Sequence, residues 1–399
     1  MSIPFDIVWY LSGEWETDHR RSMISSFARN MPEGGKILCV NRPICLPLAL
    51  FKDRKRLIKR MNESAVQKQS GNLYTYTPIV YIHDQIASRT PIVRVLQRWR
   101  MQLHLRRIMS ELGFASRVRL SWIYNPWQKH CIGLAGEVAY IYECYDAYSE
   151  FGSALMGREE IRKTDEEMAR GAMAVFATAK KLYADKVKLN ENCWYIPNAV
   201  DSSVCEHTRA SQSVPDGMKS ISRPIVGFVG HVDDCFIDCD LLEYLATSNP
   251  AISFVFIGDI RTNARARALW RMHNVRALGY RKYEELPGYL AHFDVGIMPF
   301  RRNRITESLC PLKLYEYMAA GCPTVSTTIP EVAGCGDLIS IAETHEGFDA
   351  LLKKAVETGK DAVGKRLIEE SRHHTWDNRT PSMITHIGVC IKESNLMVS

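Results

Sequence analysis

Short runs of apolar residues alternate with longer amphipathic segments along the first half of the chain. Each run is four to six residues long and rich in aliphatic and aromatic residues, which is typical of buried strands. The strands expected from these runs are residues 6–11, 36–40, 73–76, 120–124, 138–142 and 174–177, and the helices expected from apolar spacing are residues 20–28, 91–112 and 157–172. This order predicts a parallel sheet covered by helices on both faces.

The same alternation resumes after a change near residue 200. Residues 197–201 (Pro-Asn-Ala-Val-Asp) are followed by a polar, weakly patterned stretch that ends at Arg223. Further strands are expected at residues 224–230, 253–258, 275–279, 295–299 and 324–327. The chain is 399 residues long, which is sufficient for two cores of ordinary size. We therefore expect two α/β domains that meet between residues 200 and 201.

The segment from Pro311 to Gly321 reads as one helix that leads into a strand. Pro311 suits the first helical position, and Gly321 suits the left-handed residue that ends a helix. Lys313 and Glu316 are three residues apart, so they share a face near the positive end of the helix. Such a cation can bind an anion, and a carboxylate one turn later can accept hydroxyl groups, which suits a nucleotide's diphosphate and ribose. From the spacing alone, an ordinary Lys–Glu surface pair is the simpler interpretation.

The wider sequence around this helix resembles a known motif. Residues 311–325 read P-L-K-L-Y-E-Y-M-A-A-G-C-P-T-V and follow Asn303 and Thr306. This run resembles the donor-binding segment of GT-B glycosyltransferases of the glycosyl transferases group 1 kind, in which the motif is approximately P-x-K-x-x-E-Y-x-A-x-G-x-P-V-V. Further stretches that resemble this family are residues 142–148, 227–231, 279–299 and 374–379, so the resemblance covers most of the chain.

The resemblance implies the GT-B fold, in which two Rossmann-like, doubly wound parallel-sheet domains face a cleft. It implies acceptor binding by residues 1–200, onto which helices at 377–399 cross back, and donor binding by residues 201–376. The implied activity is a hexosyltransferase-type transfer of sugar from a nucleotide-diphosphate sugar to a glycan or lipid-linked acceptor, in surface or exopolysaccharide synthesis. The donor-site residues that it implies are Gly230, His231, Tyr280, Lys313, Leu314 and Glu316.

The loop after the first strand of the second half departs from the commoner family pattern. Many relatives place an Arg and a Lys there, whereas this chain reads His-Val-Asp-Asp-Cys from His231. The phosphate charge is therefore expected to be balanced by Lys313, with Arg261, Arg301 or Arg302 as further candidates. Members of the family generally stabilise the leaving diphosphate with backbone dipoles and basic side chains, so neither a metal ion nor a cofactor is expected.

A second departure concerns an acidic residue. The family's paired Glu, eight residues before Glu316, would fall at Ser308. Glu307 is one position away from it, so a donor-sugar contact by Glu307 is not assigned.

Asp146 is the candidate general base. It comes soon after the expected strand at 138–142, and an inverting transfer needs a carboxylate to deprotonate the acceptor hydroxyl. Glu16 and Asp18, in the loop after the first strand, are alternatives, and a helix-cap or turn role for Asp146 is equally favoured. A retaining transfer would need no such base. The acceptor-side candidates are Gly13, Trp15 and Glu16.

The composition is that of a globular protein, with 46% apolar and 24% charged residues. No apolar run approaches the ~20 residues needed to cross a bilayer, and the N-terminus has no signal-peptide pattern, so a cytoplasmic location is expected. The 12 cysteines lack zinc-like spacing, because the closest pair, Cys235 and Cys239, has no second pair. We expect reduced thiols and no metal site.

The net charge of +6 is uneven, because residues 1–200 carry 29 Lys and Arg against 20 Asp and Glu, and residues 201–399 carry 22 against 25. The excess gathers at residues 52–60 and 94–107, where apolar residues separate the basic ones. Such a surface suits the inner face of an anionic membrane or a lipid-linked phosphate, although a solvated charged face explains either cluster equally well. Nucleic acid is not expected, because no aromatic-interleaved binding motif accompanies the charge.

Two other classes compete with the glycosyltransferase. A GT-B sugar-nucleotide epimerase would need several acids and histidines around one sugar, which the sequence does not clearly supply. A non-catalytic scaffold that binds a nucleotide sugar or a partner transferase fits the altered phosphate loop and the Ser308 position. A nicotinamide dehydrogenase is disfavoured, because no G-x-G-x-x-G follows a first strand.

Overall fold

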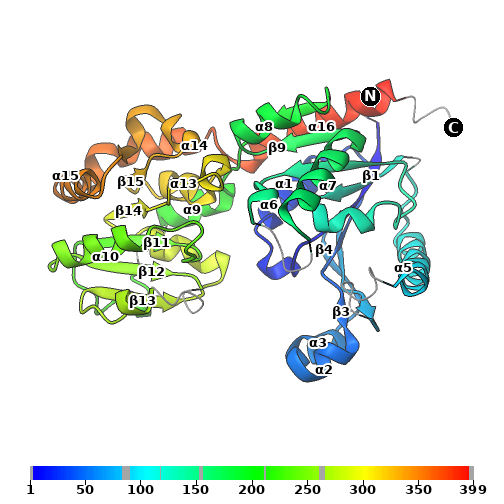
Figure 1. The fold of residues 1–399 in the computed structure, drawn as a ribbon, viewed down its shortest axis with the longest axis horizontal. Helices are drawn as coiled ribbons and strands as arrows, with labels where there is room; N and C mark the ends of the chain where they lie inside the picture. The colour runs from blue at the N-terminus through cyan, green and yellow to red at the C-terminus, as the bar shows by residue number, and fades with distance from the viewer. Residues whose placement is uncertain are drawn as a thin grey trace. The chain divides into compact units, whose positions relative to one another are not determined.

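The computed structural model describes residues 3–82, 90–116, 118–151, 156–210, 213–259 and 266–394, without the side chains of residues 207–210. The chain divides into two compact units (Figure 1). Unit 1 comprises residues 1–177, 182–196 and 380–399, and unit 2 comprises residues 178–181 and 197–379. The expected domains, residues 1–200 with 377–399 and residues 201–376, differ from these units at residues 178–181, 197–200 and 377–379.

Unit 1 is built on a sheet in the order β10-β9-β8-β7-β1-β2-β5-β4. All pairs are parallel except β4 with β5. The strands are β1 (Phe5–Tyr10), β2 (Ile37–Val40), β4 (Val66–Ser70), β5 (Leu73–Tyr76), β7 (Val118–Ile123), β8 (Ala139–Cys144), β9 (Ala174–Ala177) and β10 (Cys193–Tyr195). All six residues of the central strand β1 are buried, as its mostly apolar composition predicts. The core includes Trp9 stacked on Trp122, with ring centroids 4.0 Å apart.

The helices of unit 1 cover this sheet. They are α1 (Arg21–Asn30), α5 (Pro91–Glu111), α6 (Tyr148–Phe151), α7 (Arg158–Gly171), most of α8 (Lys180–Lys186) and most of α16 (Trp376–Glu393). The last helix, red in Figure 1, packs on α1, where the hydroxyls of Ser26 and Thr380 are 2.9 Å apart. A small layer at the end of β5 consists of β3 (Ile44–Cys45), β6 (Ile79–Val80), α2 (Leu46–Lys52) and α3 (Arg54–Asn62).

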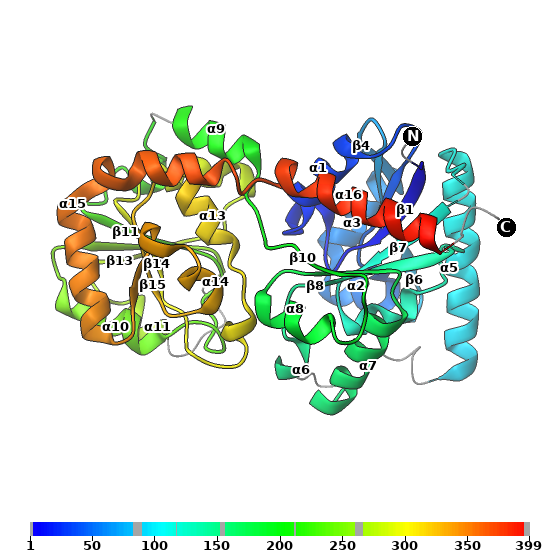
Figure 2. The same cartoon turned by 90° about the horizontal axis from the view of Figure 1, so that it is seen from above.

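Unit 2 is built on a parallel sheet in the order β13-β12-β11-β14-β15-β16. The strands are β11 (Ile225–Val229), β12 (Ser253–Ile257), β13 (Val275–Gly279), β14 (Val295–Met298), β15 (Thr324–Thr327) and β16 (Ser340–Ala342). Its helices are α9 (Ser202–Ala210), α10 (Cys239–Ser248), α11 (Ala266–Leu269), α12 (Leu286–Leu290), α13 (Leu312–Ala319), α14 (Pro330–Ala333) and α15 (His345–Ser371). Figure 2 shows α10 and α11 on one side of this sheet and α9 and α13 on the other. This is the doubly wound arrangement expected for both halves of the chain.

The described residues also contain short 3-10 helices, which are η1 (Trp15–Thr17), η2 (Pro126–Cys131), η3 (Asp216–Met218), η4 (Tyr283–Glu285), η5 (Thr306–Ser308) and η6 (Gly336–Leu338). Among the helices that the structure describes, none is both long enough and apolar enough to cross a bilayer.

Candidate functional site

The order of strands in unit 2 reverses between β11 and β14. From β11 the chain proceeds to β12 and β13 on one side, and β14, β15 and β16 follow on the other. Ligands of such sheets bind beyond the carboxyl ends of the strands at this switch point. Gly230 comes directly after β11, and α13 follows β14 after a loop at residues 299–311. Gly230, His231, Lys313, Leu314 and Glu316 therefore lie on or next to the elements that flank the switch point, whereas Tyr280 follows the edge strand β13.

Small residues in the strands allow α13 to lie close to the sheet. A Cβ added to Gly296 in β14 would be 2.7 Å from the Tyr317 ring, so only glycine leaves room for this side chain. The Tyr317 hydroxyl accepts a hydrogen bond from the backbone N–H of Val229, at 3.0 Å. This bond joins α13 to the end of β11, and it thereby fixes Lys313, one turn earlier on the helix, relative to Gly230.

Lys313 lies beside two aromatic rings. Its Nζ is 4.2 Å from the ring centroid of Phe228 and 4.9 Å from that of Phe300. Burial lowers the pKa of the Lys313 ammonium to about 8, and the charge of Glu316 offsets only part of this effect. Among the residues that the structure describes, Lys313 forms no ion pair. A desolvated ammonium without a carboxylate partner is suited to bind an anionic ligand.

Two glycines at the strand ends adopt conformations that other residues rarely adopt. Gly230 has a φ of 141°, and a Cβ added there would lie 3.0 Å from the Lys313 Nζ. Gly258 has a φ of 138°, and an added Cβ would lie 2.1 Å from the Gly230 carbonyl oxygen. The space beside the ammonium is therefore kept open by the absence of a side chain at Gly230, so a ligand can approach both the backbone and the cation there.

Glu316 is buried, with 7% of its surface exposed. Burial raises the pKa of its carboxyl group to about 7, and the charge of Lys313 lowers it by less. The simple surface pair that the spacing suggested is therefore excluded, because a surface pair would be solvated and both groups here are desolvated. Gly321 has a φ of 59°, which confirms the expected left-handed residue after α13.

The other expected donor-site residues are less closely grouped. Leu314 belongs to the hydrophobic core and its N–H is directed to the Pro311 carbonyl, at 3.2 Å, so we do not retain it as a binding residue. His231 is exposed, and its Nε2 lies 3.8 Å from Asp233. Tyr280 follows β13 and is 57% exposed, so its ring is available to a ligand.

The loop before α13 is shaped by Asn303. Its Oδ1 accepts hydrogen bonds from the N–H groups of Ile305 at 2.9 Å and Thr306 at 3.0 Å. Arg301 donates from Nε to the Ile237 carbonyl at 3.2 Å, which ties this loop to the one after β11. Arg302 is exposed, and Arg261 lies outside the described residues.

Glu307 does not face the ammonium of Lys313. It is exposed, and it forms an ion pair with Lys181 of the same unit. The hydrogen bond with Lys181 lowers the pKa of the Glu307 carboxyl group. Ser308, at the family's acidic position, is buried. The structure therefore gives no support for a donor-sugar contact by Glu307.

Asp146 follows the carboxyl end of β8 in unit 1. Burial raises the pKa of its carboxyl group to about 7, and the charge of Arg20 offsets part of that rise. A carboxyl group with this pKa can exchange a proton near neutral pH, as a general base must.

Arg20 and Glu143 form a buried ion pair that sequence reasoning did not identify. The Arg20 Nη2 lies 2.9 Å from the Glu143 Oε1, and the Arg20 guanidinium lies 4.6 Å from the centroid of the Tyr145 ring. Glu143 also accepts a hydrogen bond from the Trp122 indole at 2.9 Å. The available signal was a carboxylate inside the otherwise apolar run of β8, since a buried charge requires a partner.

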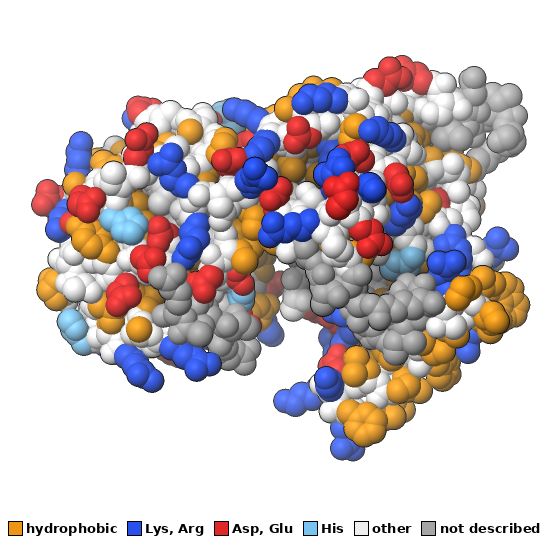
Figure 3. Space-filling view, viewed as in Figure 1, with side chains coloured by type: hydrophobic (Ala, Val, Ile, Leu, Met, Phe, Trp, Pro, Cys, Tyr) orange, Lys and Arg blue, Asp and Glu red, His pale blue; other side chains and the backbone are white. Residues whose placement is uncertain are grey.

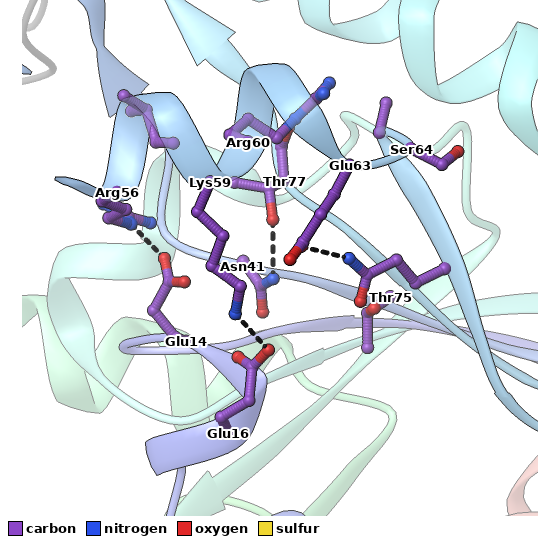
Figure 4. Close-up of a pocket in the computed structure, with 13 residues that line it drawn as sticks. Glu14, Glu16, Asn41, Arg56, Lys59, Arg60, Glu63, Ser64, Thr75 and Thr77 are labelled. Carbon is purple, nitrogen blue, oxygen red and sulfur yellow. Dashed lines mark hydrogen bonds and ion pairs between the residues drawn. The ribbon is translucent and has the colours of Figure 1, made fainter. Parts of the chain in front are cut away.

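The acceptor-side candidates lie in the loop after β1. Trp15 is buried, and its backbone N–H donates a hydrogen bond to the Asn41 Oδ1 at 3.0 Å. Glu16 lines a pocket, and its carboxylate lies 2.8 Å from the Lys59 ammonium of α3 (Figure 4). Burial raises the pKa of Glu16, but Lys59 and nearby groups lower it further, so the net shift is downward. A carboxylate held in this way is a poor base.

The remaining two candidates of this loop, Gly13 and Asp18, differ in their surroundings. A Cβ on Gly13 would come no closer than 3.9 Å to another side chain, so the structure shows no steric need for glycine there. Asp18 is buried, and it accepts a hydrogen bond from the Arg20 N–H at 2.8 Å. Burial raises the pKa of its carboxyl group, although hydrogen bonding and the charge of Arg20 oppose the rise.

Within the described residues, no group of three or more His, Cys, Asp or Glu side chains is placed to hold a metal ion. All 12 cysteines are free thiols, and most of them are buried.

Comparisons with known proteins agree with this architecture. Residues 223–357 match the family model Glycosyl transferases group 1. A 158-residue segment, 39% of this chain, is 28% identical to TuaH of Bacillus subtilis (strain 168), whose name describes a teichuronic acid biosynthesis glycosyltransferase. The aligned segment spans only 38% of that relative.

Solved structures are similar over nearly the whole chain. Sucrose-phosphate synthase from Thermosynechococcus elongatus matches with a TM-score of 0.70 and 13% identity, over 99% of this chain and 100% of that one. Anabaena Alr3699/HepE in complex with UDP matches with a TM-score of 0.60 and 13% identity, over 96% of this chain and 98% of that one. The chain therefore has the expected GT-B fold, and its second unit carries the part that matches the Glycosyl transferases group 1 family.

Proposed function

We propose that this protein is a glycosyltransferase that moves a sugar from a nucleotide-diphosphate sugar to a glycan or lipid-linked acceptor in cell-surface polysaccharide synthesis. The observation that carries the proposal is the Lys313 ammonium, which is desolvated, has no ion-pair partner among the described residues and lies beside the open position at Gly230. Its position at the switch point of unit 2 is where a nucleotide is expected to bind.

In this proposal unit 2 binds the donor. The diphosphate lies beside Gly230 and Lys313, and the bound anion raises the pKa of the ammonium and keeps it charged. Glu316 accepts hydrogen bonds from the ribose hydroxyls. The bond from the anomeric carbon to the diphosphate oxygen breaks, and Lys313 and the start of α13 stabilise the charge that develops on the leaving group.

Unit 1 binds the acceptor in this proposal. In an inverting transfer, the Asp146 carboxylate removes the proton of the attacking hydroxyl as the new glycosidic bond forms. The buried Arg20, whose charge opposes the rise in the pKa of Asp146, keeps part of the carboxyl population deprotonated near neutral pH. The Arg20–Glu143 ion pair holds this guanidinium in place, which makes Arg20 a positioning residue.

The choice of substrates draws on the similar proteins. TuaH is named for teichuronic acid biosynthesis, and HepE has been solved with UDP and with UDP-glucose. We therefore propose a UDP-sugar as the first donor to test and a surface polysaccharide as the product. The proposal further includes action in the cytoplasm, at the inner face of the cell membrane, without a metal ion.

A thermal-shift screen against UDP, GDP, ADP, TDP and CDP tests the donor site, with Glu316→Ala beside the unchanged protein. We expect one nucleotide to raise the unfolding temperature by a few degrees, and we expect the substitution to abolish this shift. The absence of a shift with every nucleotide would contradict the donor site. Nucleotide binding without transfer to any acceptor would instead favour a non-catalytic scaffold that binds a nucleotide sugar.

A further inference from the structure

Helix α5 of unit 1 has an apolar face that is open to solvent. The exposed apolar residues of this helix are Ile92, Val95, Leu96, Trp99 and Leu103, with exposed fractions between 44% and 74%. Their spacing of three and four residues places them on one face. The buried residues of the helix, Leu105, Ile108 and Met109, all lie towards its carboxyl end. The amino-terminal part of α5 is therefore not packed into the core of unit 1.

Helices α2 and α3 expose a second set of apolar side chains. These are Leu48, Leu50, Phe51, Ile58 and Met61, and Phe51 is 88% exposed. The buried cluster beneath the two helices is small and consists of Ile44, Ala49 and Leu57. Figure 3 shows apolar side chains gathered over α5 and over α2 and α3, with Lys and Arg side chains beside them. Side chains that could have completed the small core point to solvent instead.

A groove of about 280 Å³ with mostly apolar walls lies beside the exposed face of α5. Its walls come from α5 and from the segment of β5 and β6, and the residues include Tyr76, Ile79, Val80, Leu96 and Met101. Ile79 also packs against the small core under α2 and α3. The exposed apolar surface of unit 1 therefore contains a groove with apolar walls, which water alone would solvate poorly.

These helices carry a large excess of basic residues. Residues 46–62 contain six Lys and Arg and one Asp, and residues 91–111 contain five Arg and one Glu. Arg56 and Lys59 pair with Glu14 and Glu16. The exposed Lys52, Arg54 and Lys55 form no ion pair with any residue that the structure describes.

This combination identifies the class of partner. Protein interfaces are depleted in Lys at their centres, whereas a bilayer with anionic headgroups attracts Lys and Arg and accepts apolar side chains beneath them. Trp and Tyr are enriched at the same depth, as Trp99 and the half-exposed Tyr81 would be.

We propose that α2, α3 and α5, together the docking surface, bind an anionic bilayer, and that the groove beside α5 takes a hydrocarbon chain of a lipid. The apolar side chains lie at the boundary of headgroups and acyl chains, and the Lys and Arg side chains bind the phosphates. This surface would bring the glycosyltransferase of the proposed function to the membrane, and in that respect the proposal rests on that function. Vesicle binding is measured without donor or acceptor, so a failure to bind vesicles is distinguishable from a failure of glycosyl transfer.

Flotation of the full chain with vesicles tests this proposal. We expect binding to vesicles that mix phosphatidylcholine with phosphatidylglycerol, little binding to phosphatidylcholine alone, and loss of binding as salt rises. The double variant Phe51→Ser/Trp99→Ser should bind at least about tenfold less, because both side chains would insert into the bilayer. The control Val214→Ser/Val389→Ser changes residues outside the docking surface that are 40% and 42% exposed, and it should bind normally.

A second pair of variants isolates the charge. Arg54→Gln/Lys55→Gln should weaken binding to anionic vesicles by about 30-fold, while Lys354→Gln/Lys365→Gln on α15 should leave it unchanged. All these residues are exposed, so the variants should fold. Equal binding to neutral and anionic vesicles, equal losses in the control variants or no vesicle binding at all would overturn the proposal. A change of oligomeric state in Phe51→Ser/Trp99→Ser without any vesicle binding would show a protein interface instead.

Discussion

For Lys313 and Glu316, the sequence predicts the position on the helix, and the structure adds the environment of the two side chains. The motif placed both on α13, one turn apart, and the structure has them there. The spacing could not show that both side chains are desolvated, because burial depends on Phe228, Phe300 and other residues distant in the sequence. A desolvated ammonium and a buried carboxyl group both lower the stability of the protein without a ligand, as is common at functional sites.

Replacement of Lys313 by methionine should therefore stabilise the protein without ligand and abolish its response to nucleotide. The pKa of Lys313 is about 8 in the folded protein against an ordinary value of 10.5, so below pH 8 the fold carries the cost of a desolvated charge. We expect Lys313→Met to raise the free energy of unfolding at pH 7 by about 1 to 3 kcal/mol. The gain should shrink between pH 8 and pH 10.5 as the folded protein loses this proton. Chemical denaturation across this range measures it, and a destabilised variant would contradict the account.

Asp146 should control the acid side of the pH–rate profile. Its carboxyl group has a pKa of about 7 and must be deprotonated to act as a base, so kcat/KM should rise with pH up to about 7 and then level. Asp146→Asn should lower kcat/KM by about 10² to 10⁴-fold and remove this dependence. The binding of nucleotide should be unchanged in the variant. A profile that keeps its acid limb in Asp146→Asn would assign the base elsewhere.

At the scale of elements, the sequence predicts the strands and helices that have a hydrophobic pattern of their own. It does not predict the strands that form only because they pair with a neighbouring strand. The runs at β1, β11 and β12 are mostly apolar, and the structure has strands there. Strand β4 is not predicted because its residues are largely exposed and polar. It forms a strand at the sheet edge through its pairing with β5. The two-residue strands β3 and β6 are too short to carry a pattern.

The site in unit 2 depends on the space beside the Lys313 ammonium, and the absence of a side chain at Gly230 keeps this space open. Gly230→Ala places a Cβ 3.0 Å from the Lys313 Nζ and imposes backbone strain of about 1 to 3 kcal/mol at a φ of 141°. We expect nucleotide binding to fall at least about tenfold, because the ammonium must shift. Gly336→Ala is the matched control, since its φ is also positive, at 61°, but open space surrounds it. Equal effects of the two variants on nucleotide affinity, measured by calorimetry, would show that strain alone is responsible.

At the scale of the whole molecule, the resemblance to the group 1 glycosyltransferases provided the fold, and the βα alternation supported it independently. The expected division into two domains differs from the two units only at residues 178–181, 197–200 and 377–379. Residues 180–181 and 377–379 lie within α8 and α16, so at these two places the boundary falls inside a continuous helix and no turn in the sequence marks it.

Transfer should persist when divalent ions are removed. The leaving diphosphate would be stabilised by Lys313 and by backbone N–H groups, which chelation does not affect. We expect the turnover of nucleotide sugar to be unchanged within about twofold after dialysis against EDTA, and Lys313→Met to abolish turnover in either buffer. A loss of turnover that added Mg²⁺ or Mn²⁺ restores would overturn the proposed metal independence.

The most direct test of the donor site is a calorimetric comparison of UDP with UMP, using the unchanged protein and Lys313→Met. If Lys313 binds the diphosphate, the unchanged protein should bind UDP at least about tenfold more tightly than UMP, and Lys313→Met should lose most of this difference. If UDP is not the nucleotide, the one that the thermal-shift screen selects replaces it, with its own monophosphate. A folded Lys313→Met that keeps the full preference for the diphosphate would contradict the account, because the second phosphate would then be bound elsewhere.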